Sequence, residues 1–319
     1  MNKIKNFLSN IQLLEPISSK NGHEITIIPL ALNSEPKINY ISLAEAIKTG
    51  NFEIKESSAE GIVQTISAVN NTHDYVLIVE GEELIGAKQN RIINTTILLK
   101  PQSITNIPVS CIEQGRWRFT TERFRTRDRI VDYELRKKTH ETVFFNLKAS
   151  GSYRSDQSEI WNTISKKFFR EKINSPTQSY SDFLDEYTDR YNIDNLIDYF
   201  DREFFRKYEC NGLAVLINSQ VKMIEYFSSK RFFKNFALNL IKGLFIHLPE
   251  TSKKSPAIFD KVFEVKKFLN LIMENETNFE KYKPIGIGEE YRFSNHNLKL
   301  NASSLVLENE LIHFVAYNG

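Results

Sequence analysis

The chain has 319 residues, of which 41% are hydrophobic and 26% charged, and its formal net charge is +2. This balance permits a sizeable core and argues against general disorder, and the near-neutral charge argues against a field that would gather a polyanion. Two cysteines do not make a disulfide framework, and the longest apolar region, residues 236–248, is too short to span a bilayer. We therefore expect a soluble cytoplasmic protein without a membrane partner.

The first part of the chain, residues 1–117, has the pattern of a β-rich region. A short helix is predicted over 43–47, because Ser42 is a favoured N-cap and Gly50 a favoured stop. Strands spaced roughly ten residues apart favour an antiparallel β-sandwich or barrel-like sheet over alternating βαβ units. The predicted strands cover residues 24–30, 62–69, 74–80, 92–99 and 103–109.

Residues 118–208 are mainly helical in pattern, and residues 209–319 mix helices and strands. A hairpin is predicted over 212–226, followed by a long helix that begins at Ser228 or Ser229, and three or four short strands close the chain. Late strands commonly complete an early sheet, so we predict one intertwined α+β domain over 1–319, with a helical insertion and C-terminal strands that return to the sheet. The other predicted helices cover residues 133–148, 158–172, 180–191, 194–208 and 258–274.

Polar residues crowd the end of the predicted strand 74–80. Three glutamates occur within 80–83, and cations follow at Lys88 and Arg91. Carboxylates held close to one another and to a cation have shifted pKa values, which suits a general acid or base, or a site for a hard cation. Gln89 and Asn90 each offer a donor and an acceptor for a ribose or a base edge. The competing interpretation is a solvated turn with surface ion pairs.

A second polar segment follows the predicted strand 103–109. Cys111 lies near Arg116, which would lower a thiol pKa and favour a nucleophile, although a cysteine at a strand end is more often a small buried residue. Glu113 with Arg116 has a different use, because arginine binds phosphate bidentately and Trp117 offers a flat face for a base or sugar. An internal ion pair beside a core tryptophan is the structural alternative.

Other motifs carry less information. The arginines of 116–129 alternate with aromatic residues, which is a weak nucleic-acid pattern, but acidic residues dilute it and nucleic acid is not the expected partner. No histidine pairs with another histidine or a cysteine at ligand spacing, so no metal site and no cofactor is predicted. The glycines of 286–288 lack the third glycine and the helix of a dinucleotide fingerprint.

The two polar segments carry a family resemblance. Residues 81–91, Gly-Glu-Glu-Leu-Ile-Gly-Ala-Lys-Gln-Asn-Arg, and residues 107–117, Ile-Pro-Val-Ser-Cys-Ile-Glu-Gln-Gly-Arg-Trp, resemble motifs of the ADP-ribosylglycohydrolase and rhodanese-phosphatase associated protein family. Looser likeness lies in residues 43–46, 211–227 and 286–289. The resemblance implies a prokaryotic protein in an ADP-ribose or phosphate context, in a defence or stress operon, because gene neighbours gave the family its name.

The leading hypothesis is a nucleotide-directed protein that binds or processes an ADP-ribose- or NAD-related ligand. The alternatives are a non-catalytic protein-interaction module whose polar motifs brace the fold, and a metal-assisted hydrolase that uses the glutamates of 80–83. The sequence leaves the oligomeric state, a protein partner and the existence of catalysis open. The predicted acid/base residues are Glu82 and Glu113; the ligand-binding residues are Lys88, Gln89, Asn90, Arg91, Gln114, Arg116 and Trp117; the nucleophile candidate is Cys111.

Overall fold

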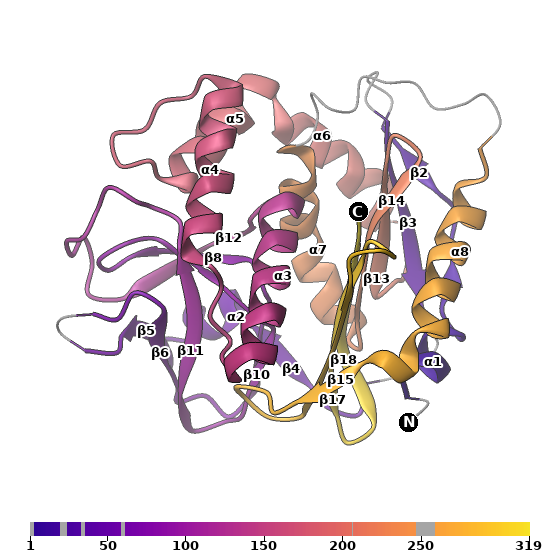
Figure 1. Cartoon of the computed structure of the whole chain (residues 1–319), viewed down its shortest axis with the longest axis horizontal. Helices are drawn as coiled ribbons and strands as arrows, with labels where there is room; N and C mark the ends of the chain where they lie inside the picture. The colour runs from indigo at the N-terminus through magenta and orange to yellow at the C-terminus, as the bar shows by residue number, and fades with distance from the viewer. Residues whose placement is uncertain (1–2, 20–23, 33–35, 59–60, 206, 247–258) are drawn as a thin grey trace.

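The chain folds into an α+β structure, as predicted. Helices lie between and outside antiparallel sheets, and among the described strands only β4 and β7 pair in parallel (Figure 1). The computed structural model describes residues 3–19, 24–32, 36–58, 61–205, 207–246 and 259–319.

A nine-stranded sheet joins the two ends of the described chain. The C-terminal strands return, through the β13–β14 hairpin, to a sheet begun by β3 near the N-terminus, which confirms the prediction that late strands pair with early ones. The order is β1 (Gln12–Leu13), β3 (Ile25–Ala31), β13 (Gly212–Ile217), β14 (Gln220–Phe227), β18 (Glu310–Asn318), β17 (Leu300–Leu307), β16 (Glu289–Asn295) and β15 (Glu280–Tyr282), with β2 (Ile17–Ser18) beside β3.

A separate six-stranded sheet carries both polar segments. It curls until its two edge strands meet at a bridge between Lys55 and Arg123, as expected of a barrel-like sheet. Its order is β12 (Phe124–Ile130), β8 (Glu82–Gly86), β9 (Arg91–Ile93), β11 (Ser103–Cys111), β6 (Thr65–Asn70) and β5 (Phe52–Glu56). A three-stranded sheet lies next to it, in the order β10 (Ile97–Leu99), β7 (Tyr75–Ile78) and β4 (Tyr40–Ser42).

The helices begin where the sequence supplies caps. Ser42 and Glu45 form a capping box at α2, and the Ser229 hydroxyl accepts from an amide of the first turn of α7. The predicted helix 194–208 is wrong in length, since α6 ends at Phe200 and a short π-helical turn follows. The α-helices are α1 (Lys3–Leu8), α2 (Leu43–Lys48), α3 (Tyr133–Ser150), α4 (Gln157–Glu171), α5 (Tyr180–Tyr191), α6 (Ile193–Phe200), α7 (Lys230–Leu244) and α8 (Lys261–Glu274).

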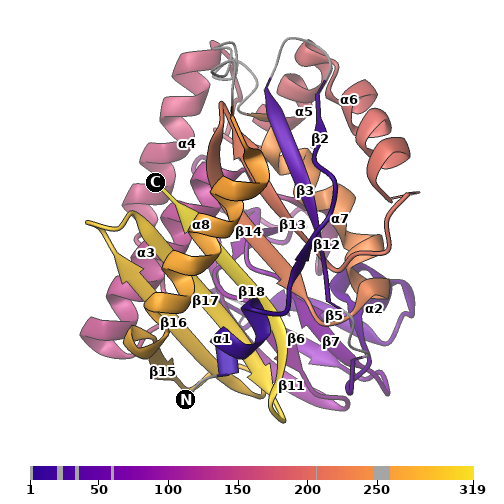
Figure 2. The same cartoon turned by 90° about the vertical axis from the view of Figure 1, so that its right-hand side faces the viewer.

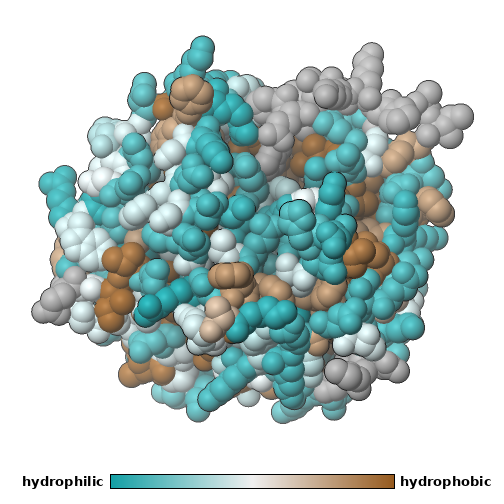
Figure 3. Space-filling model, viewed as in Figure 1, coloured by the Kyte–Doolittle hydropathy of each residue, from teal (hydrophilic) through white to brown (hydrophobic). Residues whose placement is uncertain are grey.

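Three large apolar clusters, and a small fourth one of Val143, Leu147 and Tyr153, hold these layers together. One lies between the nine-stranded sheet and helices α3–α7, where the aromatic rings of α5 and α7 gather. A second lies on the other face of that sheet, under α1 and α8 (Figure 2). A third fills the space enclosed by the curled sheet and α2. The face shown in Figure 3 is mainly hydrophilic, with small separate hydrophobic patches.

A buried ion pair connects α3 to the nine-stranded sheet. Arg136 of α3 donates to both oxygens of Glu225 of β14, at 2.8 and 2.9 Å, and the His313 ring nitrogen lies 2.9 Å from the same carboxylate. The Arg136 side chain reaches this position by passing over Gly81. A Cβ at Gly81 would lie 2.7 Å from the Arg136 Cγ, and the φ of Gly81 is +84°. The first glycine of the polar segment is therefore required for close approach.

We expect Gly81→Ala to destabilise the protein far more than Gly50→Ala. Both glycines have positive φ, but nothing lies within 4 Å of a Cβ at Gly50, so the control carries the backbone strain alone. The added collision at Gly81 should cost about 1–3 kcal/mol beyond the control, measured by urea unfolding. Equal losses for the two variants would contradict the role of Gly81 as a passage for Arg136.

Candidate functional site

Strand β8 presents two adjacent glutamates to different surroundings, because successive side chains of a strand point to opposite faces. Glu82 is buried and accepts a 2.6 Å hydrogen bond from the Val79 amide. Burial raises the pKa of Glu82 to about 8, partly offset by that hydrogen bond and reinforced by Asp128. Its carboxyl is therefore mainly protonated at neutral pH.

Glu83, on the opposite face of β8, belongs to a hydrogen-bond network with α5. Its carboxylate accepts from Arg129 and from the Ser181 hydroxyl. The side-chain NH2 of Asn90 in turn donates to the Ser181 hydroxyl at 3.0 Å, so the turn after β8 is tied to the same helix. Glu83, which was not among the predicted site residues, thus ties β8 and the turn after it to α5, whereas Glu82 accepts its hydrogen bond from Val79.

Arg116 is the centre of the network. Its buried guanidinium donates to the Ala87 carbonyl at 2.8 Å, the Arg118 carbonyl at 3.0 Å and the Asn90 side-chain oxygen at 3.0 Å. It also makes a 2.6 Å ion pair with Glu113. One side chain therefore fixes the β8–β9 turn against the segment that follows β11.

Glu113 is saturated with donors. Besides Arg116, the Thr177 hydroxyl donates to it at 2.9 Å and the backbone N–H of Asn90 at 3.2 Å. Burial would raise the pKa of Glu113, but the hydrogen bonds from Arg116, Thr177 and Asn90 outweigh it and hold the pKa below the usual value. This carboxylate stays ionised at neutral pH and is already occupied.

Arg91 is fully buried beside Cys111. Its Nη1 donates to Gln89 Oε1 at 2.8 Å and lies 2.7 Å from Cys111 Sγ, and its Nη2 is 3.8 Å from Glu56 Oε1. Among the described residues, Nε and Nη2 of Arg91 have no hydrogen-bond partner. An arginine in this state retains donors for an oxyanion.

Cys111 does not have the surroundings of a nucleophile. Burial raises its pKa to about 11, although Arg91 acts in the opposite direction. Its Sγ lies 3.6 Å from the Val63 carbonyl oxygen. Its backbone amide donates to Gln157 Oε1 and its carbonyl accepts from Gln157 Nε2, each at 2.8 Å. A thiol in this position behaves as a small apolar residue.

An aromatic face covers this end of the curled sheet. The Trp117 ring is 45% exposed and Phe119 is 51% exposed. The Lys88 ammonium lies 5.3 Å from the Trp117 centroid and 5.1 Å from that of Phe119, and the Arg91 guanidinium lies 5.5 Å from the Trp117 ring. Gln114 is also exposed. Surface access in the two polar segments is thus concentrated at Lys88, Gln114 and Trp117.

This geometry accompanies a match over nearly the whole chain. Residues 10–317 match the family described as the ARG and Rhodanese-Phosphatase-superfamily-associated Protein domain. The chain belongs to this family. The family name links it to proteins associated with ADP-ribosylglycohydrolase. No curated protein and no solved structure matches the chain. Within the described residues, every helix is too short or too polar to cross a bilayer.

The structure separates the predicted residues of the family motifs into groups. Asn90, Glu113 and Arg116 are hydrogen-bonded to one another in the buried network. Arg91 contacts both Gln89 and Cys111, and the Lys88 ammonium lies over the Trp117 ring. Glu82 faces Arg136 and Asp128 instead. No group of three or more His, Cys, Asp or Glu among the described residues is arranged to hold a metal ion, so the cluster at 80–83 gives no support to metal-assisted hydrolysis.

A second buried cluster, which sequence reasoning missed, lies between the sheets. Tyr317 donates to Glu80 at 2.6 Å, and Arg136 approaches the same carboxylate at 3.9 Å. Burial raises the pKa of Glu80 and lowers that of His140, whose ring packs on Tyr317. These residues come from segments more than fifty positions apart, so local spacing carries no signal of them; the packing of α3 and residue 80 against β18 creates the cluster.

The buried acid Glu82 predicts a pH dependence of stability. In the folded state its carboxyl keeps a proton that the unfolded chain releases above the ordinary pKa of 4.5, so stability falls as the pH rises from 4.5 to about 8. We expect the stability of Glu82→Gln, whose side chain is neutral at every pH, to fall less over this range. Above the pKa of Glu82 in the folded state, the variant should be more stable than the wild type. Urea unfolding across that range measures it.

Glu53→Gln is the matched control. The pKa of Glu53 is lowered by its hydrogen bond with Lys55, so it contributes stability that is lost toward acid and does not contribute to the fall above pH 4.5. A Glu82→Gln curve parallel to that of the wild type would show that Glu82 is ionised in the folded protein.

Both thiols of the folded protein should resist alkylation at neutral pH. Burial raises the pKa of Cys111 to about 11 and that of Cys210 to about 12, so little thiolate forms at either residue. Iodoacetamide labelling followed by mass spectrometry should show two modified cysteines only after urea unfolding. Rapid labelling of one thiol in the folded protein, abolished by Cys111→Ser, would instead identify Cys111 as a nucleophile.

Proposed function

We propose that this chain binds an ADP-ribose- or NAD-related nucleotide at the Lys88–Trp117–Phe119 face. The observation that carries the proposal is the Trp117 ring, 45% exposed and flanked by the Lys88 and Arg91 cations at 5.3 and 5.5 Å. An exposed aromatic ring stacks on a base, and the ammonium of the partly exposed Lys88 neutralises phosphate, whereas the fully buried Arg91 supports the ring. The family association with ADP-ribosylglycohydrolase supports this ligand class.

The buried network supports the proposal by fixing this face before a ligand arrives. Arg116 holds the carbonyl of Ala87, which directly precedes Lys88, and also the carbonyl of Arg118, which directly follows Trp117. Both residues of the face are therefore attached to one guanidinium. Pre-organisation of this kind reduces the entropy cost of binding.

Catalytic roles for Glu82 and Glu113 remain predictions. Glu113 has the lowered pKa of a carboxylate fully engaged by Arg116 and two other donors, which suits a positioning residue. Glu82 has the raised pKa of a general acid, but its neighbours are Val79, Asp128 and Arg136 rather than Trp117.

A second function, a protein-interaction module, is favoured by the burial of the motif residues. Glu113 is 5% and Arg116 9% exposed, as expected if the network only braces the fold. In that case the exposed Trp117 and Phe119 would contact a protein rather than a nucleotide, since large exposed aromatic residues are also enriched at protein interfaces. Ligand titration separates the two functions.

We expect ADP-ribose to quench Trp117 fluorescence in a Trp161→Phe background and to release heat in calorimetry. Base stacking contributes about 1–3 kcal/mol, so Trp117→Ala should weaken binding by roughly tenfold to a hundredfold. Lys88→Ala should weaken binding and reduce its salt dependence, because a phosphate contact is lost. Phe169→Ala, which removes an 88% exposed aromatic residue on α4, should bind as the wild type does.

The absence of heat and quenching with ADP-ribose, NAD and an ADP-ribosylated peptide would overturn the proposal, as would unchanged binding by Trp117→Ala. Glu113→Gln then reports on the brace alone. If it lowers the melting temperature by several degrees while the wild type binds none of these ligands, the protein-interaction function is supported.

A further inference from the structure

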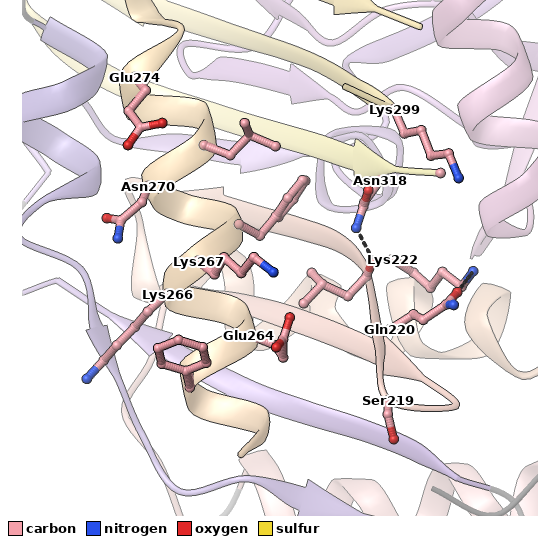
Figure 4. A pocket seen from close by; sticks show the side chains of 15 residues that line it. Ser219, Gln220, Lys222, Glu264, Lys266, Lys267, Asn270, Glu274, Lys299 and Asn318 are labelled. Carbon is pink, nitrogen blue, oxygen red and sulfur yellow. Dashed lines mark hydrogen bonds between the residues drawn. The ribbon is translucent and has the colours of Figure 1, made fainter. Parts of the chain in front are cut away.

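A groove of about 780 Å³ lies between α8 and one end of the nine-stranded sheet. Figure 4 shows α8 as one wall and the β13–β14 hairpin with the end of β18 as the other. Apolar side chains from both walls line it, namely Val221 of β14 with Phe268 and Leu271 of α8. Asn318 closes part of the sheet side by donating to the Val221 carbonyl at 2.9 Å. Each wall of the groove thus carries both apolar and polar side chains.

Positive charge lines both walls of this groove. Lys222 and Lys299 lie on the sheet side, and Lys267 extends from the side of α8 that faces the hairpin. Within the described part of the chain, neither Lys267 nor Lys299 forms an ion pair, unlike Lys281 or Lys148, which pair with glutamates at 2.5 Å. The lining also holds two glutamates of α8, Glu264 and Glu274, against four lysines, Lys222, Lys266, Lys267 and Lys299.

An exposed aromatic residue adds an apolar contact point. Phe263, in the first turn of α8, lines the groove and is 59% exposed. Large exposed apolar residues beside a polar rim mark interaction surfaces more often than isolated ones do. A partner that buries Phe263 would be guided into the groove by the lysines.

We propose that this groove docks an amphipathic, acidic peptide segment of a partner protein. Apolar side chains of the segment would lie on Phe263 and Leu271, over the buried Val221 and Phe268, and its carboxylates would pair with Lys222, Lys267 and Lys299. A nucleic acid fits less well, because the lining offers one exposed aromatic ring and no arginine. The groove lies beside α8 on the outer face of the nine-stranded sheet, whereas β11, which leads to Trp117, belongs to the six-stranded sheet, so the proposal does not depend on nucleotide binding (Figures 1 and 2).

The test uses the full chain and three fluorescein-labelled peptides of equal length. The first is an amphipathic helix of leucine, phenylalanine and glutamate; the second has the same composition in a scrambled order; the third replaces glutamate by lysine. We expect only the first to bind in fluorescence anisotropy, and added salt to weaken it. The double variant Lys222→Glu/Lys267→Glu should lose roughly tenfold or more in affinity, and Phe263→Ala should also weaken binding.

The control variant is Lys281→Glu, which changes a lysine on β15 away from the groove and should leave peptide affinity unchanged. Equal binding of the ordered and scrambled peptides, or of an oligo-dT strand, would show that the groove only collects negative charge and would overturn the proposal. Absence of binding by the ordered peptide, or undiminished binding by the folded double variant, would overturn it as well. Circular dichroism verifies that each variant is folded.

Discussion

The buried guanidinium of Arg116 is the constraint on which the geometry of the family motifs depends. It binds carbonyl oxygens on both sides of the network and makes a 2.6 Å ion pair with Glu113. Burying a charge is costly unless it is paired, and removing one partner of such a buried pair typically costs about 3–5 kcal/mol. The turn between β8 and β9 and the segment after β11 are therefore positioned together.

The two ends of β8 serve different parts of the molecule. At its start, Gly81 lets Arg136 pass to Glu225 of the nine-stranded sheet, and Glu82 is buried next to that path. At its end, the chain turns through Lys88 to Asn90 under the Trp117 ring. The short strand β8 thus links the ion pair between α3 and the nine-stranded sheet to the aromatic face. This explains why the motif is long and dense in polar residues.

The sequence predicted most elements but not their partners. Caps and periodicity located α2 through Ser42, the helix after Ser229 and the hairpin of β13 and β14, because these signals are local. Residues 92–99 were predicted as one strand but form β9 and β10 in different sheets, and β8 itself was taken for a polar strand end. Sheet membership is a long-range property that alternation along one segment does not encode.

For the site, the sequence predicted acid/base and ligand-binding residues in both polar segments, and the structure shows hydrogen bonds between the segments. Glu82 rather than Glu83 was predicted as an acid/base residue, yet strand direction decides that Glu83 is the one that joins Ser181 and, through it, Asn90. The sequence left open whether Cys111 is a nucleophile or a small buried residue. In the structure, burial raises the pKa of Cys111 although Arg91 is adjacent. The cluster around Tyr317 depends on contacts between distant segments and carries no local signature.

The central claim is that a rigid buried network presents Trp117 and Lys88 to a nucleotide. A crystal structure of the full chain with ADP-ribose tests it most directly. The account predicts a base or ribose stacked on Trp117, phosphate oxygens beside Lys88, and an Arg116–Glu113 pair that keeps its ligand-free geometry. A ligand bound elsewhere, or a complex in which that pair separates to admit the nucleotide, would contradict the account.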